Sequence, residues 1–171
     1  VKLWQTSATS TKPLAKHAAA VTAVAVTGDG KLSISAGADK AIHVSDLGTG
    51  KPVRAIQELP AAVTAAAVSA DNTLIAAGLD SGAIHLFSIA DGTEKETIGA
   101  HQGSVSGLAF RPQAGQLASV GVDGKIRIWE LPAAAPRLLN GHTGAITACA
   151  VSPDGNLLAA ALLGGVAVAT Q

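Results

Sequence analysis

The chain has 171 residues, with 12 basic and 12 acidic side chains and a formal net charge of zero. Because no overall positive field exists to attract phosphates or anionic lipid, this charge balance disfavours nucleic-acid binding and attraction to membrane surfaces. With 48% hydrophobic and 14% charged residues, the composition excludes a disordered solvating chain and fits one domain of ordinary size.

Taken in chain order, the predicted elements are short strands that recur with a fixed spacing. Val1–Trp4 opens the chain as a strand, and four similar segments follow. These segments start 42, 42 and 41 residues apart, at Val21, Val63, Val105 and Ile146. A second marker recurs at intervals of 42, 42 and 40 residues, at Ile42, Ile84, Ile126 and Val166. Two independent markers with one period indicate a tandem repeat.

Within each repeat the pattern predicts strands rather than helices. Short runs of Val and Ile are separated by turn residues such as Gly28-Asp29-Gly30 and Asp154-Gly155, which leaves no room for an ordinary helix. The alternation in Ile42-His43-Val44 is typical of a strand with one buried face. Val21–Val26 consists almost wholly of Val, Ala and Thr, and we expect it to be covered on both faces. Each repeat is therefore predicted to form three or four antiparallel strands.

The third repeat has the most specific motif. Ala100-His101 precedes its first strand, Ser119 lies in its second strand, Asp123-Gly124 forms the next turn and Trp129 ends its third strand. With the 42-residue period, these residues resemble the WD-repeat (WD40) family of β-propellers, whose repeats of about 40–45 residues each form one four-stranded blade. The resemblance implies a structural hydrogen-bonded chain that runs from Asp123 through His101 and Ser119 to Trp129. A buried carboxylate needs such partners.

The other repeats depart from this motif. The first keeps His17, Ser35 and Asp39 but has Ser45 in place of the Trp. The second and fourth replace most motif residues, with Leu59, Ala76 and Phe87 in the second, and Ala159, Leu163 and Ala169 beside Gly141-His142 in the fourth. Because the spacing and the apolar pattern survive, we expect packing to carry the fold and the polar network to reinforce it. These eroded, Ala-rich repeats resemble the bacterial style of the family.

The predicted fold is all-β, with about four propeller blades arranged radially as four-stranded antiparallel sheets, after a leftover N-terminal half blade. The expected bounds within a single propeller segment, 1–171, are a partial blade (1–16), three repeats (17–58, 59–100 and 101–141) and an incomplete repeat (142–171). Since propellers of this family most often close with about seven or eight blades, the resemblance implies part of a larger ring. Open strand edges would then invite self-association.

Two constellations resemble catalytic or phosphate-binding motifs. His101, Ser119 and Asp123 could be taken for a hydrolase triad, but no Gly-x-Ser-x-Gly elbow precedes a helix. The segment Leu47–Pro52 is Gly-rich, but it lacks the glycine spacing of a phosphate loop and lies between two predicted strands. We therefore interpret the first as a buried network and the second as a hairpin turn.

Metal and thiol chemistry are also disfavoured. His43 and His85 occupy equivalent positions in adjacent repeats, but the pattern supplies no third or fourth ligand nearby, so we interpret them as partly exposed strand residues. Cys149 has no second cysteine to pair with, and its position in a first strand predicts a small buried apolar side chain. The aromatic residues Trp4, Phe87, Phe110 and Trp129 all stand at repeat-matching positions and are expected in the core. No metal and no cofactor is predicted.

In the WD-repeat family, ligands most often dock on the face made by the loop before each first strand and the turn between the second and third strands. The candidate contacts implied on this face are Lys40, Leu79, Gln102, Val122 and Lys125. We predict a non-catalytic scaffold for protein–protein interactions, with protein partners unknown, no nucleic acid, no membrane insertion and an unassigned compartment. The alternative is the propeller portion of a larger enzyme or redox protein whose catalytic domain lies outside this chain.

Overall fold

The computed structural model describes residues 2–4, 11–112, 115–132, 135–139, 144–162 and 165–170. Throughout these ranges the regular elements are strands, and none of the described residues forms a helix that could cross a membrane. The prediction of an all-β chain is confirmed.

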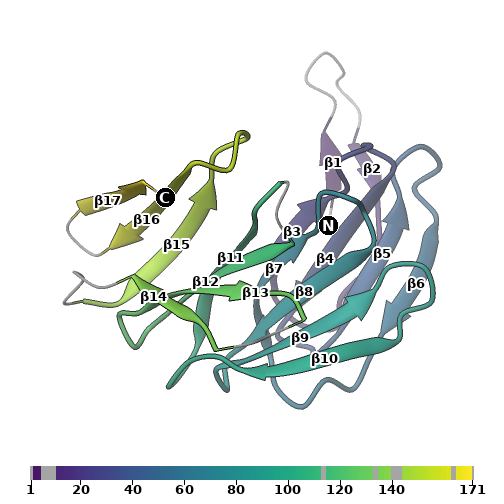
Figure 1. Cartoon of the computed structure of the whole chain (residues 1–171). Coiled ribbons are helices and arrows are strands. Elements are labelled where there is room, and N and C mark those ends of the chain that lie inside the picture. Colours follow the sequence, from purple (N-terminus) through teal and green to yellow (C-terminus); the bar gives the residue numbers. More distant parts are fainter. Residues whose placement is uncertain are drawn as a thin grey trace.

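The described strands form separate antiparallel sheets that fan out side by side (Figure 1). A two-stranded sheet comes first, formed by β1 (Lys2–Trp4) and β2 (Thr11–Pro13). Blade 1 contains β3 (Val21–Val26), β4 (Leu32–Gly37), β5 (Ile42–Asp46) and β6 (Pro52–Ile56). Blade 2 contains β7 (Val63–Val68), β8 (Leu74–Leu79), β9 (Ala83–Ser88) and β10 (Glu94–Gly99). Blade 3 contains β11 (Val105–Phe110), β12 (Gln116–Gly121), β13 (Ile126–Glu130) and β14 (Arg137–Leu139). Blade 4 contains β15 (Ile146–Val151), β16 (Leu157–Leu162) and β17 (Gly165–Thr170).

Side chains in the turns explain why each strand folds back on the one before it. In the turn between β3 and β4, Thr27 Oγ1 donates to Asp29 Oδ1 at 2.7 Å, and the Lys31 amide donates to the same oxygen at 3.1 Å. The Ser69–Asp71 pair forms an equivalent contact in blade 2 at 2.5 Å. Short polar side chains that bond to nearby backbone amides stabilise tight turns, so these residues direct the antiparallel pairing.

The first strands of successive blades, β3, β7, β11 and β15, lie next to one another (Figure 1). In the first three of these strands, a hydroxyl at the second position joins the strand to the next one. Thr22 Oγ1 donates to the Val63 carbonyl and Thr64 Oγ1 donates to the Val105 carbonyl, both at 2.5 Å. Ser106 Oγ donates to the Ile146 carbonyl in the same way. These hydrogen bonds hold neighbouring blades in register.

The core lies between the blades. Ile34 and Val44 of blade 1 pack against Val63, Ile75 and Phe87 of blade 2. Equivalent clusters join blade 2 to blade 3 around Ile84, Val105 and Trp129, and blade 3 to blade 4 around Val120, Ile146 and Leu158. The close approach explains the small residues, since a Cβ at Gly78 would lie 2.5 Å from Val105 Cγ1.

The expectation that Val21–Val26 is covered on both faces is wrong. In β3, Val21, Val24 and Val26 are 41%, 61% and 51% exposed. In β7, by contrast, Val63 is fully buried, because β7 lies between two neighbouring blades. Among the described sheets, blade 1 packs its core against blade 2 alone, which leaves one side of β3 in solvent.

Candidate functional site

Four side chains of blade 3 form a continuous hydrogen-bonded chain. His101 lies in the loop before β11, Ser119 in β12, Asp123 in the turn between β12 and β13, and Trp129 in β13. Trp129 Nε1 donates to Ser119 Oγ at 2.9 Å. His101 Nε2 lies 2.9 Å from the same oxygen, and His101 Nδ1 lies 2.8 Å from Asp123 Oδ1. These hydrogen bonds link two strands and two loops of one blade.

The burial of Ser119 indicates how the protons are arranged. Ser119 is fully buried, and among the described residues His101 Nε2 is the acceptor within reach of its hydroxyl. We therefore assign the Ser119 hydroxyl as the donor to Nε2, which leaves the Nδ1 proton of His101 to be donated to Asp123. Burial lowers the pKa of His101 and outweighs the opposing effect of Asp123, so the imidazole is neutral at neutral pH.

Asp123 is an ionised carboxylate with several donors. Burial acts to raise its pKa, but hydrogen bonds from His101, from the Gln102 amide and from Arg127 outweigh burial and lower the pKa of Asp123 to about 2. Arg127 Nη1 donates to Asp123 Oδ2 at 3.0 Å and lies 2.7 Å from His101 Nδ1. Sequence reasoning did not include Arg127, although strand pairing places it directly opposite Ser119.

Blade 1 has a shorter version of the same network. His17 Nδ1 lies 3.0 and 2.9 Å from the two carboxylate oxygens of Asp39, and His17 Nε2 lies 2.8 Å from Ser35 Oγ. The side chains of His17 and Asp39 are 1% and 9% exposed. Burial acts to raise the pKa of Asp39, but the hydrogen bonds from His17 and the Ala18 amide outweigh it and leave that pKa below its usual value.

Each of these carboxylates joins two loops. Asp39 Oδ2 accepts from the Ala18 amide at 2.9 Å, and Asp123 Oδ2 accepts from the Gln102 amide at 3.2 Å. Asp123 Oδ1 also accepts from the Lys125 amide at 3.2 Å. The loop before the first strand is thereby tied to the turn between the second and third strands in both blades. We call these contacts the Asp39 and Asp123 clamps.

The face implied by the sequence contains four exposed residues and one buried residue. Lys40, Gln102, Val122 and Lys125 are exposed in these loops and turns. Leu79 is not, because its side chain is 0% exposed and packs in the core between blades 1 and 2. It is the last residue of β8, and its place in the strand directs it inward. The inclusion of Leu79 among the surface contacts is therefore wrong.

A family model described as "WD domain, G-beta repeat" matches residues 8–46, 92–130 and 135–165, which together make up more than half of the chain. The chain belongs to the WD40 repeat family. No curated protein sequence matches it. The predicted resemblance and the predicted propeller blades are both confirmed.

Two solved structures show how the chain relates to other WD40 proteins. A crystal structure of RRP9 WD40 repeats is similar with a TM-score of 0.83 and 26% sequence identity, over 91% of this chain and 49% of that chain. A structure of U3-55K gives a TM-score of 0.78 and 24% identity, over 91% of this chain and 53% of that chain, and this likeness shows the fold. The chain spans about half the length of these two structures.

The WD40 family model does not match residues 47–91, which include three strands of blade 2. Blade 2 nevertheless forms a complete four-stranded sheet. Leu59, Ala76 and Phe87, which replace the polar motif, are 5%, 0% and 4% exposed. Apolar packing in this WD40 blade takes the place of the hydrogen-bonded network. In the fourth repeat, the retained Gly141-His142 and the departure at Leu163 lie outside the described residues.

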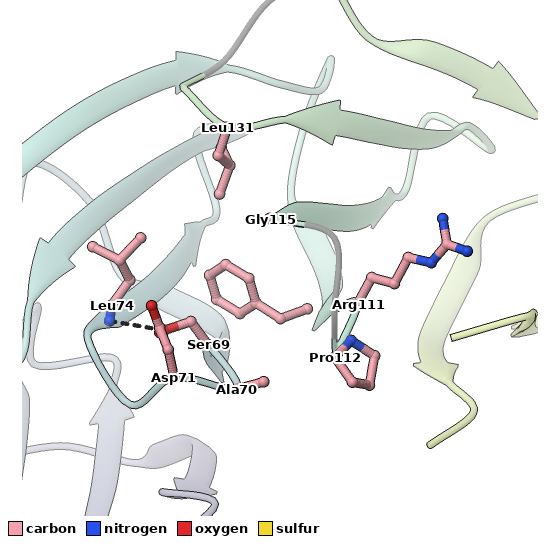
Figure 2. Close-up of a pocket in the computed structure, with 9 residues that line it drawn as sticks. Ser69, Ala70, Asp71, Leu74, Arg111, Pro112, Gly115 and Leu131 are labelled. Atoms are coloured by element: carbon pink, nitrogen blue, oxygen red, sulfur yellow. Dashed lines mark hydrogen bonds between the residues drawn. The ribbon is translucent and has the colours of Figure 1, made fainter. Parts of the chain in front are cut away.

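A cavity of about 390 Å³ opens between blades 2 and 3 (Figure 2). Its lining is both apolar and polar and consists of Ser69, Ala70, Asp71, Leu74, Phe110, Arg111, Pro112, Gly115 and Leu131, whereas the clamps lie at the other end of the strands. Asp71 accepts from Ser69 Oγ at 2.5 Å, and Arg111 Nη1 donates to Gln116 Oε1 at 3.0 Å. Sequence reasoning missed this cavity because two blades form it together.

The remaining sequence candidates have structural partners. In the hairpin turn between β5 and β6, the Thr49 amide donates to Asp46 Oδ1 at 2.7 Å and the Gly50 amide donates to the Asp46 carbonyl at 2.8 Å. These amides already have acceptors within the turn, which disfavours a phosphate loop. Burial raises the pKa of the Cys149 thiol to about 12, and a thiol that stays protonated is a poor nucleophile.

Of the two strand histidines, His85 differs from the expected exposure and His43 matches it. His85 is buried rather than partly exposed, and its Nδ1 lies 2.9 Å from Glu94 Oε1. His43 is partly exposed as expected, but the expectation that no third ligand lies nearby is wrong for this residue. His17, Asp39 and His43 each offer a ligand atom, and these atoms lie within 4.8 Å of one another. The pairing of Ser35 with His43 across β4 and β5 could have indicated this.

Proposed function

We propose that this WD40 chain is a non-catalytic scaffold for protein–protein interactions. The observation that carries the proposal is the pair of clamps, since Asp39 and Asp123 each hold two exposed loops in one geometry. A loop that is already ordered loses less conformational entropy when a partner binds. Repeat arrays also offer extended rigid surfaces for partners.

The exposed residues on the clamped loops favour a particular partner chemistry. Lys40 and Lys125 supply positive charge, Gln102 supplies hydrogen-bonding groups, and Val122 is 47% exposed. Because the whole chain has no net charge, this local positive charge would act at short range. The surface is suited to a protein segment that presents carboxylates around an apolar side chain.

The geometry of the His–Ser–Asp set supports the non-catalytic part of the proposal. Ser119 is 0% exposed, and its Oγ accepts the indole N–H of Trp129. A nucleophile must reach the carbonyl carbon that it attacks, and a fully buried hydroxyl that bonds to an indole cannot do so without unfolding the blade. The propeller portion of a larger enzyme or redox protein stays an untested alternative.

The test compares protein capture by the wild-type chain and by two charge variants. A Lys40→Glu/Lys125→Glu double variant should lose the proteins that the wild type recovers after cross-linking. Lys51→Glu, an exposed change in the hairpin turn between β5 and β6, should retain them. With a purified partner, the Kd of the wild type should rise with salt, as expected for exposed charge pairs. Equal recovery by all three proteins, or recovery of none, would refute the proposal.

A third variant separates the clamped face from the cavity on the opposite side. Leu131→Arg places a charge in the apolar part of the cavity between blades 2 and 3. If the clamped face carries the interaction, this variant should bind the partner with an unchanged Kd. Loss of binding in Leu131→Arg together with full binding in the Lys40→Glu/Lys125→Glu variant would contradict the assignment to the clamped face.

A further inference from the structure

Blades 1 and 3 share a His–Ser–Asp network but differ in one side chain beside it. In blade 3, strand pairing places Arg127 opposite Ser119. In blade 1, the same pairing places His43 opposite Ser35. The two positions are structurally equivalent, so a guanidinium in one blade corresponds to an imidazole in the other.

This difference determines which group can neutralise the negative charge of the buried aspartate in each blade. Arg127 donates to Asp123 Oδ2 at 3.0 Å, so blade 3 supplies its own cation beside the His–Asp pair. In blade 1 the ring of His43 stands edge-on to that of His17, with centroids 4.4 Å apart and an interplanar angle of 76°. Burial and the nearby His17 lower the pKa of His43 below its usual value.

We propose that His17, Asp39 and His43 form a binding site for a divalent transition-metal ion of the zinc type. Two imidazoles and one carboxylate are a common protein ligand set for Zn²⁺, with a water molecule in the fourth position. Ligand atoms at zinc–ligand distances of about 2.0–2.1 Å lie about 3.4 Å apart in a tetrahedral site. The three ligand atoms here lie within 4.8 Å of one another, so a small side-chain contraction closes the site.

The surroundings of blade 1 supply the outer hydrogen bonds that such a site needs. When His17 Nδ1 binds a metal, the ring proton resides on Nε2, which lies 2.8 Å from Ser35 Oγ and can donate to it. The Ala18 amide donates to Asp39 Oδ2 at 2.9 Å and orients the carboxylate. In blade 3 the indole of Trp129 donates to the equivalent serine, whereas blade 1 has Ser45 at the Trp position. Ser35 Oγ therefore has no competing indole donor and can accept the Nε2 proton of His17.

The position of the three side chains gives the metal a route of entry. The side chains of His17 and Asp39 are 1% and 9% exposed. As whole residues, His17, Asp39 and His43 are all partly exposed, so the cluster lies close to solvent. Imidazole ligands favour zinc, copper and nickel over magnesium or calcium, which prefer oxygen ligands. Metal binding at this site needs no protein partner, although Asp39 also forms one of the two clamps on which the proposed protein-binding face depends.

The experiment titrates the chelator-treated chain, purified without a polyhistidine tag, with Zn²⁺ against a chromophoric competitor and with Co²⁺ for its visible absorption. The wild type should bind one equivalent tightly and give the Co²⁺ absorption of a tetrahedral site. His43→Gln and His43→Arg leave the bonds among His17, Asp39 and Ser35 in place, so the blade should stay folded. Each should weaken binding by at least about 100-fold, since loss of even an outer-sphere partner costs about 10–100-fold.

Two further variants serve as a control for metal affinity and as an attempt to create a second metal site. His85→Gln removes a strand histidine outside the cluster and should leave the affinity unchanged. Arg127→His places the same three ligand types beside one another in blade 3, although Trp129 still donates to Ser119 there. It should therefore add a second, weaker equivalent. Zn²⁺ should also raise the Tm of the wild type but not that of His43→Gln. Binding that survives His43→Gln, the absence of stoichiometric binding by the wild type, or an unchanged stoichiometry in Arg127→His would overturn the proposal.

Discussion

At the scale of single residues, Ser119 and Ser35 occupy the same place in two blades but have different partners. Ser119 connects Trp129 Nε1 to His101 Nε2, whereas Ser35 contacts His17 without an indole donor. Ser119→Ala should therefore leave a buried indole N–H unpaired, at a cost of about 1–3 kcal/mol in the free energy of unfolding. Urea denaturation of the variant and the wild type measures this loss. Ser35→Ala is the matched control and should cost less; equal losses would contradict the assigned role of Trp129.

The buried carboxylate of Asp123 predicts a loss of stability in acid. Its pKa is about 2 in the folded chain and 3.8 as the reference value, so the folded state favours the ionised form. The corresponding stabilisation, about 2 kcal/mol, is fully present above pH 4 and is lost as the pH falls from about 4 to about 2. Asp123→Asn should be less stable at pH 6 and should show a flatter dependence of unfolding free energy on pH. Parallel slopes in the two proteins between pH 2 and pH 4 would refute this.

The site residues differ in how far the sequence could predict them. His101, Ser119, Asp123 and Trp129 stand at positions of the WD40 motif, so the resemblance to that family was enough to propose a connection between them. The place of His43 depends instead on which residue of β4 it faces across the sheet. The pairing of β4 with β5, which sets His43 opposite Ser35, follows from the turn between these strands. The alignment of the repeats contains no direct information on this pairing.

At the scale of strands, the hydroxyls that join the blades predict a measurable coupling. Thr64 Oγ1 in β7 donates to the Val105 carbonyl in β11 at 2.5 Å. Thr64→Val keeps the shape of the side chain but removes this donor, and it should lower the free energy of unfolding by about 1 kcal/mol. Thr147→Val is the control, because Thr147 Oγ1 is exposed and donates to Ala161 within its own blade. Chemical denaturation that shows the same loss for both would contradict a role in joining blades.

The strands themselves could be predicted well, and their environments less well. The 42-residue period and the turn residues indicated antiparallel strands that the structure contains in every blade. The exposure of β3 could not be predicted, because an apolar first strand has the same composition whether or not another sheet covers it. Leu79 shows the converse case, in which a residue beside a predicted turn still faces inward from the end of its strand.

At the scale of the whole molecule, stability depends on contacts between consecutive blades. Each described core cluster joins two blades, so the array resembles repeat proteins whose stability comes from nearest-neighbour interfaces. Small residues at the interfaces between blades allow this stacking, as the close approach of Gly78 in β8 to Val105 in β11 shows. In blade 1, by contrast, β3 presents exposed apolar side chains at Val21, Val24 and Val26.

This exposed face predicts that the isolated chain associates with itself. Val24, with 61% of its surface exposed, lies between Val21 and Val26 on the same strand, and contiguous exposed apolar side chains favour association. Sedimentation velocity over a range of protein concentrations should show association of the wild type and a shift toward monomer in Val24→Asp. Val53→Asp, at a valine that is 52% exposed on β6, should leave the association unchanged. A wild-type chain that stays monomeric throughout, or equal effects of the two substitutions, would show that β3 does not drive association.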